Sequence, residues 1–455
     1  MAKKRNIGLI SATVSIIVIL GLLGWFLTTI FESEKPRIQL TPHPEFISDK
    51  QDFVITVGDQ KRGIRRIEVS VKQGNRPRKI LEKTFPFEGL LNCDGTHRFN
   101  TRFEINPSSL NLAQGQADLI ISVWDYSRRN GGDGNLSVVE HNMIVDTIPP
   151  AVRPVCTRNY INVGGSGLTV YQTTSDAIKS GLFVNNIFFP GFPAGKGSLE
   201  GMHVCYFCIP LAINGKPNIC LWAEDRAGNC SKGIFPCHIR QKRFREDKIN
   251  ITDRFLKQIL PYFSAYLKDA AGSDIEKFLK INRDLRQKNA ESFYNLRTLT
   301  SPEMLWEGAW LRLKNAAKMA GFGDHRSYYY KGKKVDEQTH LGVDLASLAG
   351  SEVQAANNGR VIFADNLGIY GLTVVLDHGQ GLASTYSHLS SIRVQAGQTV
   401  KRGDVIGTTG QTGLAAGDHL HYGVMVNGIF VNPIEWWDNH WIQDNITRKL
   451  DMLRQ

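Results

Sequence analysis

The residues best suited to hydrolytic chemistry are concentrated in the C-terminal part of this 455-residue chain, where seven of its 12 histidines lie between His325 and His440. The stretch GDHLHYGV places His419 and His421 one residue apart. In an extended strand, residues i and i+2 point to the same face. We therefore expect both imidazoles to face one space. On its own, such a pair is more often a solvated or hydrogen-bonded strand edge than a metal or catalytic pair.

Other motifs precede this pair in order along the chain. The stretch THLGVD places His340 and Asp344 four residues apart, His388 follows a strand-like run, and residues 400–413 have the glycine spacing of a hairpin. A catalytic zinc site needs three protein ligands and one open position, which two histidines and a carboxylate can supply. His340 and Asp344 with one histidine of the HLH pair would form that set. His388 and the other histidine would then be available for general-base and charge-stabilising roles.

Together these motifs resemble the LytM/lysostaphin-type zinc metallopeptidases, which cut peptide bonds in peptidoglycan. The resemblance runs from about His340 to Pro433, and it includes HLGVDLA, GLTVVLDHGQGLASTYSHLS, VQAGQTVKRGDVIGTTGQTG, DHLHYGV and the final Asn-Pro pair. It implies that His340, Asp344 and His421 bind Zn²⁺. It also implies that His388 and His419 are active-site histidines that do not bind the metal, with the division of labour between them left open.

Three further histidines of this region are assigned lesser roles. We expect His378 to lie at a strand end, in a turn or beside a metal ligand, and not to bind the metal itself. His325, flanked by Asp324 and Arg326, is expected on a loop surface, with an inhibitory metal ligand as the alternative. His440 is expected to be a tail residue.

The N-terminus predicts a membrane anchor. An uncharged run from Ile7 to Phe31 follows Lys3, Lys4 and Arg5. Such a run is long enough to cross a hydrocarbon core of about 30 Å, and a cleaved signal peptide would have a shorter apolar region. Because basic flanks stay in the cytoplasm, the rest of the chain is expected outside it. We assign residues 1–35 to a cytoplasmic tip and an uncleaved signal anchor.

Two β-rich modules are predicted next, at 36–148 and 149–241. Short alternating stretches such as DFVITV and ADLIISVW are typical of a β-sandwich, and Pro149-Pro150 marks a boundary. Both modules place an aspartate, Asp125 or Asp225, after a strand and before a Gly-Asn turn. This pattern resembles the ends of bacterial immunoglobulin-like modules, which act in spacing and adhesion. These side chains are also natural turn caps.

The cysteines cluster in the second module, and their spacing leaves the chemistry open. Disulfides or buried free thiols are expected there. Cys205-x-x-Cys208 could instead be redox-active or a zinc half-site, but no second CxxC pair follows it. Because no cysteine lies beyond Cys237, a metal site in the C-terminal domain has to use histidine and carboxylate.

Residues 242–321 are charged, poor in glycine and helical in their apolar period, so we predict a helical connector. Ser273-Asp274-Ile275-Glu276 is a capping box. Ser301-Pro302 is expected to open a further helix that ends before Gly321, with an apolar stripe formed by Leu305, Trp306, Ala309, Leu313 and Ala316.

The expected fold is therefore mixed and mainly β: a transmembrane helix, two immunoglobulin-like modules, the connector and a glycine-rich β peptidase domain at 322–455. The resemblance implies a lysostaphin-like, duplicated hybrid motif for that last domain, and a single-pass protein of the Gram-negative inner membrane with its C-terminal domains in the periplasm. Peptidoglycan is the expected substrate, and the β modules are expected to contact cell-envelope proteins.

Alternative functions were weighed against this one. The net charge of +11 suits an acidic partner such as carboxylate-bearing peptidoglycan or anionic lipid, although a solvated surface explains it equally well. Export argues against nucleic acid as a partner. The main alternative is a non-enzymatic LytM-type regulator or scaffold that recruits or activates another cell-wall hydrolase.

Overall fold

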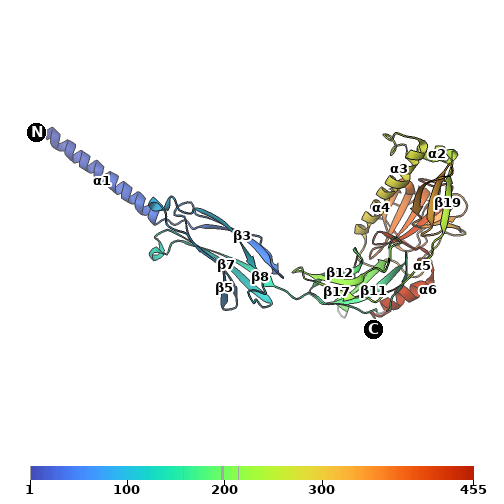
Figure 1. The fold of residues 1–455 in the computed structure, drawn as a ribbon, viewed down its shortest axis with the longest axis horizontal. Helices are drawn as coiled ribbons and strands as arrows, with labels where there is room; N and C mark the ends of the chain where they lie inside the picture. The colour runs from blue at the N-terminus through green and yellow to red at the C-terminus, as the bar shows by residue number, and fades with distance from the viewer. Residues whose placement is uncertain (1, 157, 196–198, 214, 455) are drawn as a thin grey trace. The chain divides into compact units, whose positions relative to one another are not determined.

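The computed structural model describes residues 2–156, 158–195, 199–213 and 215–454. The chain divides into two compact units (Figure 1). The first contains Met1–Pro149 with Arg226–Asn229, and the second contains Pro150–Asp225 with Cys230–Gln455.

The first unit begins with the apolar helix α1 (Ala2–Ile30). Its segment Leu9–Ile30 has a mean hydropathy of 2.3 and is not buried against any other part of the protein. By length and composition it can cross a membrane, and the described part of the chain has one such helix.

Two sheets with one shared core follow α1, and their strands are antiparallel apart from the β2–β8 pair. Alternate side chains of β3, such as Phe53, Ile55 and Val57, are fully buried between the sheets. This is the two-layer packing expected of a β-sandwich. One sheet has the order β1 (Arg37–Thr41), β3 (Gln51–Gly58), β6 (Arg98–Ile105); the other has β2 (Phe46–Ile47), β8 (Leu136–Val145), β7 (Gly115–Asp125), β4 (Ile64–Gln73), β5 (Arg76–Thr84), with short 3₁₀ turns η1 (Leu90–Asn92) and η2 (Asn130–Gly132) in the loops.

The second unit starts with two four-stranded sheets and a parallel two-stranded pair. The sheets have the orders β14 (Phe192–Pro193), β15 (Met202–Cys208), β11 (Ser166–Thr173), β9 (Val152–Pro154) and β13 (Ile187–Pro190), β12 (Ala177–Val184), β16 (Ile219–Asp225), β17 (Cys230–Ile234), and the pair is β10 (Tyr160–Asn162) with β18 (His238–Arg240).

The cysteines of β15 are structural. Cys205 and Cys208 are fully buried free thiols. Of the alternatives that the sequence left open, both cysteines therefore correspond to the buried free thiol. Burial raises the pKa of each thiol, which disfavours the reactive thiolate.

The connector is helical in its first part. Its elements are α2 (Asp253–Ile259), η4 (Leu260–Phe263), α3 (Asp274–Lys280), η5 (Ile281–Leu285), α4 (Arg286–Asn295) and η6 (Leu296–Leu299). The predicted capping box is confirmed, since the Ser273 backbone N–H donates to Glu276 Oε2 at 2.7 Å. A strand that was not predicted, β19 (Glu246–Ile251), precedes the helices.

The helix predicted after Ser301 is wrong. Residues 301–316 are irregular, and strand β20 (Ala317–Ala320) follows. The backbone N–H of Leu305 donates to the His378 carbonyl, and that of Trp310 donates to the Trp436 carbonyl, so these groups bond across the fold rather than along a helix. The Trp310 ring packs 5.0 Å from that of Trp436. Of the predicted apolar stripe, Trp306 is buried and the other members are half-buried, through tertiary packing of an extended segment.

A ten-stranded sheet forms the C-terminal part. Its main path is β20, β23 (Val343–Ala346), β30 (Leu420–Val426), β27 (Leu382–Ile392), β26 (Leu372–Gly379), β25 (Gly359–Asn366), β28 (Thr399–Val400), with β24 (Glu352–Gln354), β29 (Val405–Thr409) and β31 (Ile429–Val431) paired beside it and η7 (Gly368–Tyr370) between β25 and β26. A second sheet joins β19 in parallel to β21 (His325–Tyr330), which pairs with β22 (Lys333–Thr339).

The chain closes with α5 (Ile434–Trp437), α6 (Asn439–Ile442), η8 (Gln443–Thr447) and α7 (Arg448–Asp451). This tail packs on the β10–β11 region. Glu435 accepts hydrogen bonds from the backbone N–H and the hydroxyl of Ser166, and the Lys449 ammonium donates to the Leu168 carbonyl. The whole structure is mainly β, with one N-terminal apolar helix.

Candidate active site

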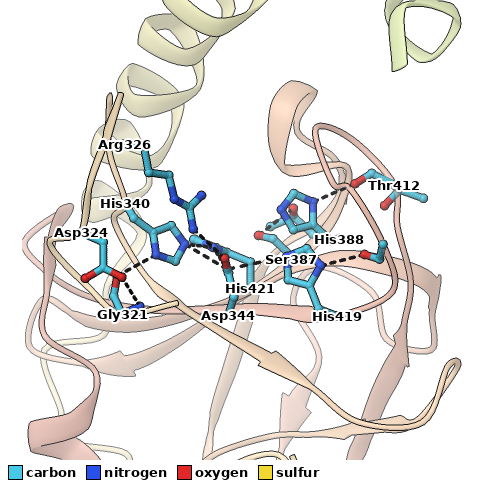
Figure 2. A network of polar contacts seen from close by, with 12 residues as sticks. Gly321, Asp324, Arg326, His340, Asp344, Ser387, His388, Thr412, His419 and His421 are labelled. Atoms are coloured by element: carbon cyan, nitrogen blue, oxygen red, sulfur yellow. Dashed lines mark hydrogen bonds and ion pairs between the residues drawn. The ribbon is translucent and has the colours of Figure 1, made fainter. Parts of the chain in front are cut away.

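The central sheet brings the predicted residues together. Asp344 on β23 lies directly opposite His421 on the neighbouring strand β30. His340 directly follows β22, three residues before the start of β23, and His388 lies on β27, on the other side of β30. His419 precedes β30 and is held by a bridge to Gly410. Figure 2 shows the five side chains around one space.

Three donor atoms form a compact triangle in this space. His340 Nε2 lies 3.0 Å from Asp344 Oδ1 and 3.0 Å from His421 Nδ1, and the last two atoms are 2.9 Å apart. All three side chains are buried. A tetrahedral zinc shell with bonds of about 2.0–2.2 Å separates its ligand atoms by roughly 3.3–3.6 Å, so the triangle has to widen by only a few tenths of an ångström to hold the ion.

The backbone fixes the tautomer of His340. Its Nδ1 lies 2.8 Å from the Gly321 carbonyl oxygen, which can only accept a hydrogen bond. Nδ1 therefore carries the proton, and the lone pair of Nε2 points at the other two donors. A second hydrogen bond of this kind is the usual way in which proteins orient a metal-binding histidine.

Asp344 is held ionised and in place from two sides. Arg326 on β21 donates to its Oδ2 at 2.9 Å, leaving Oδ1 toward the histidines. Burial opposes ionisation, but the adjacent imidazoles of His340 and His421 hold the pKa of this carboxyl well below its usual range.

His421 is packed so tightly that it has no room to turn away. Burial lowers its pKa to about 4 despite the nearby Asp344, so the ring is neutral at neutral pH. Its other nitrogen, Nε2, is buried without a partner in the described structure. A Cβ added to Gly342 would lie 2.6 Å from that nitrogen, so only glycine allows this approach of β23 to the ring.

The two remaining histidines are oriented alike. His388 Nδ1 donates to the Thr412 carbonyl and His419 Nδ1 donates to the Gly417 carbonyl, both at 2.8 Å. Each ring therefore keeps Nε2 for other partners, and His419 Nε2 lies 3.7 Å from Asp344 Oδ1. The ring centroids of His388 and His419 are 4.9 Å apart.

The environment of His388 is typical of a functional residue. Its φ of 62° lies in the left-handed region, which is strained for a residue other than glycine and often marks a functional site. Burial and the neighbouring His419 and His421 lower its pKa to about 3, which keeps it in the unprotonated form.

The five residues line a cleft with a cavity volume of about 490 Å³. One wall comes from β19 and the connector helices, including Phe278 and Arg286, and the other from η7 and the loop before His419. Cationic side chains line it together with apolar ones. The cleft is large enough for a short peptide segment.

The other histidines lie away from the cleft. His378 is fully buried and bonds the Asn358 carbonyl and the Ser384 hydroxyl. His325 is exposed at the start of β21, and His440 is exposed and near Asp444. His325 and Arg326 point to opposite faces because they are adjacent on a strand.

Sequence reasoning missed two supporting groups. The Gly321 carbonyl carries no side-chain signal at all. Arg326 could have been found, because it lies next to His325 in a motif already noted and the alternation of a strand puts one of the two toward the cleft.

Comparisons with known proteins find similarity in the segment that contains this site. Residues 338–433 match the model described as "Peptidase family M23". The DD-carboxypeptidase/endopeptidase Mpg of Neisseria meningitidis serogroup B is 41% identical over 95 residues, covering 21% of this chain and 22% of that protein. The peptidoglycan DD-endopeptidase ShyA of Vibrio cholerae is 41% identical over 96 residues, covering 21% and 22%. The matches thus span about a fifth of these curated relatives.

Among solved structures, the catalytic domain of lysostaphin from Staphylococcus simulans is 30% identical. The alignment covers 29% of this chain and 98% of that one, with a TM-score of 0.25.

Proposed function

Because residues 338–433 form a LytM/lysostaphin-type peptidase family M23 domain, we propose that the protein is a zinc metalloendopeptidase that hydrolyses peptide bonds in peptidoglycan. The observation that carries this proposal is the triangle of His340 Nε2, Asp344 Oδ1 and His421 Nδ1, with every edge between 2.9 and 3.0 Å. His340 Nε2 and Asp344 Oδ1 present lone pairs toward each other at this distance, and a shared cation is the arrangement that stabilises them.

Zinc bound there would polarise the scissile carbonyl and activate a water molecule at neutral pH. The protein's own residues supply the rest. Since the backbone occupies Nδ1 of both His388 and His419, each ring offers Nε2 to the reacting atoms. An unprotonated Nε2 accepts the proton of the attacking water, and a protonated one donates to the oxygen that becomes negatively charged.

The cleft suits a peptide that carries carboxylates. Its lining includes Arg245, Lys248 and Arg286 beside the aromatic rings of Phe278 and Tyr328. Peptidoglycan stem peptides offer carboxylates to such cations. Because relatives are named DD-endopeptidases, we propose the D-amino-acid cross-link of peptidoglycan as the substrate.

We further propose that α1 anchors the protein in the inner membrane, with the catalytic domain in the periplasm. The apolar segment Leu9–Ile30 and the basic residues Lys3, Lys4 and Arg5 before it support this orientation. The β modules would then space the peptidase from the membrane or bind envelope proteins.

The test uses the full-length chain in detergent on purified peptidoglycan of defined cross-link type. Released muropeptides are identified by mass spectrometry, and zinc is counted per chain. We expect His340→Ala to lose both zinc and cleavage. We expect His388→Ala and His419→Ala to keep zinc and to lower kcat by about 10²–10⁴-fold. His325→Ala, an exposed histidine outside the cleft, is the matched control.

Full zinc loading of the wild-type protein without release of any muropeptide would refute the proposed activity. That outcome would favour the non-enzymatic regulator, as would normal cell-wall function of cells carrying His388→Ala and His419→Ala.

A further inference from the structure

A second cluster of acidic residues lies in the first unit, at the end of the β-sandwich that receives α1. Glu32 lies just beyond α1, Asp59 just beyond β3, and Asp125 at the end of β7. The three side chains are only 5%, 3% and 0% exposed, and one oxygen of each lies within 4.8 Å of the others. Three carboxylates are rarely buried together without a compensating charge.

Turn capping explains only part of this cluster. Asp59 Oδ1 accepts the backbone N–H groups of Lys61, Arg62 and Gly63. Its second oxygen, Oδ2, is buried and has no hydrogen-bond partner in the described structure. A buried carboxylate oxygen without a partner destabilises the folded state, on the order of several kcal/mol, unless another group or an ion binds it. The cap therefore leaves the function of Oδ2 unexplained.

The amide of Asn135 is surrounded by more oxygens than it can satisfy. Its Nδ2 lies 3.0 Å from Glu32 Oε1, 2.8 Å from Asp125 Oδ2, and 3.1 and 3.2 Å from the backbone carbonyls of Glu32 and Glu34. An amide nitrogen has two hydrogens for these four acceptors. The cluster thus has an excess of oxygen lone pairs, as a site for a hard cation does.

No basic side chain balances these charges. Among the described residues, none forms an ion pair with Glu32, Asp59 or Asp125 within 4.0 Å, and the guanidinium of the buried Arg62 donates instead to the carbonyls of Leu91 and Tyr126. Burial, together with the nearby carboxylates, raises the pKa of Glu32 to about 6, and burial also raises that of Asp59. Both shifts are in the direction that burial and neighbouring carboxylates produce.

We infer that Glu32, Asp59 and Asp125 bind a divalent cation of the calcium type. All the donors are oxygens, which Ca²⁺ prefers, and the site has no histidine or cysteine ligand of the kind zinc favours. One oxygen of each side chain lies within 4.8 Å of the others, so a single ion with bonds of about 2.4 Å can reach all three.

The cation would fasten the end of α1 to the sandwich. Hydrogen bonds already hold this segment: the Ser127 hydroxyl donates to the Glu32 carbonyl at 2.9 Å, and Arg129 Nε donates to the Phe31 carbonyl at 2.8 Å. Binding at Glu32 adds a link between this segment and the loops that follow β3 and β7. The site is thus a calcium-dependent joint between helix and module.

The test titrates Ca²⁺, and separately the luminescent Tb³⁺, into the full-length zinc-loaded protein in detergent. We expect one saturable site in the first unit, slower tryptic cleavage after Arg37 with Ca²⁺, and affinity weakened by about tenfold or more in Asp59→Asn. This substitution keeps Oδ1 for the three backbone N–H groups and removes the charge. Glu104→Gln, an exposed acid of the same unit paired with Lys50, is the control.

Glu32→Gln is the second variant, for use if Asp59→Asn does not fold, because Glu32 lies outside the strands of the sandwich. Absence of saturable binding up to millimolar Ca²⁺, or binding that neither variant weakens, overturns the inference. Muropeptide release and zinc content are measured in parallel, and because the two metal sites lie in different units, failure of one proposal leaves the other intact.

Discussion

Gly342→Ala offers a sharp test of the metal site, because the substitution changes no group that could bind a metal. A Cβ at this position would lie 2.6 Å from His421 Nε2, 2.7 Å from its Cε1 and 2.7 Å from the Tyr422 carbonyl oxygen. Restoring an ordinary contact of 3.4 Å requires the ring and its strand to retreat by about 0.8 Å. The backbone angles of Gly342 are open to alanine, so this contact is the whole perturbation.

The consequence follows from how little a zinc bond stretches. Ligand distances vary by only about 0.2 Å, so a shift of about 0.8 Å takes His421 Nδ1 out of range of an ion held by the other two ligands. We expect zinc affinity to fall by about 10–100-fold, as for changes to groups that orient a ligand. Peptidoglycan cleavage should fall in parallel when zinc is limiting.

Zinc affinity is measured by competition with a chromophoric chelator. The control is Gly417→Ala in the loop beside His419, where an added Cβ has no atom within 4 Å. Wild-type zinc affinity in Gly342→Ala, with the fold intact by circular dichroism, would refute the reasoning, because His421 could then not be a ligand in the position described.

Three further predictions concern groups around this site and beneath it. Arg326→Gln removes the 2.9 Å hydrogen bond to Asp344 and should weaken zinc binding by about tenfold in the same competition assay, with little change in melting temperature. Asn289→Ala removes the acceptor of a backbone N–H in η7 and should lower the free energy of unfolding by about 1–3 kcal/mol in urea. Burial raises the pKa of Glu435 to about 7, so the folded state holds its proton more tightly than the unfolded state. Wild-type stability should therefore fall by about 3 kcal/mol relative to Glu435→Gln as the pH rises from about 4.5 to 7, and melting curves of both proteins that run parallel across this range would contradict the assignment.

The four cleft histidines and the carboxylate were predictable because each depends on side-chain type and local spacing. His340 and Asp344 lie within one motif, and His419 and His421 within another, so strand alternation was enough to orient them. Their assembly around one space still required the pairing of β23 with β30, which the sequence indicated only through the family resemblance.

The helix predicted after Ser301 failed for a physical reason that a local pattern does not contain. Trp306 and Trp310 have helical spacing, but both rings pack against Trp436, more than 100 residues later in the chain. Burial of three tryptophans together outweighs the modest propensity of a short helix. Likewise, the excess of oxygen atoms around Asp59 arises only where three loops come together, and each loop alone looks like an ordinary turn.

Strand β20 has a consequence for any attempt to isolate the catalytic part. It forms the end of the main path of the large sheet, outside β23, and it lies ahead of the first residue matched by the family model. A fragment cut at residue 338 would expose the backbone of the strand that carries Asp344, which invites pairing with other molecules and aggregation. It would also lose the Gly321 carbonyl that fixes His340. A fragment that keeps these contacts is therefore longer than residues 338–433, and it has to include β20 and Gly321.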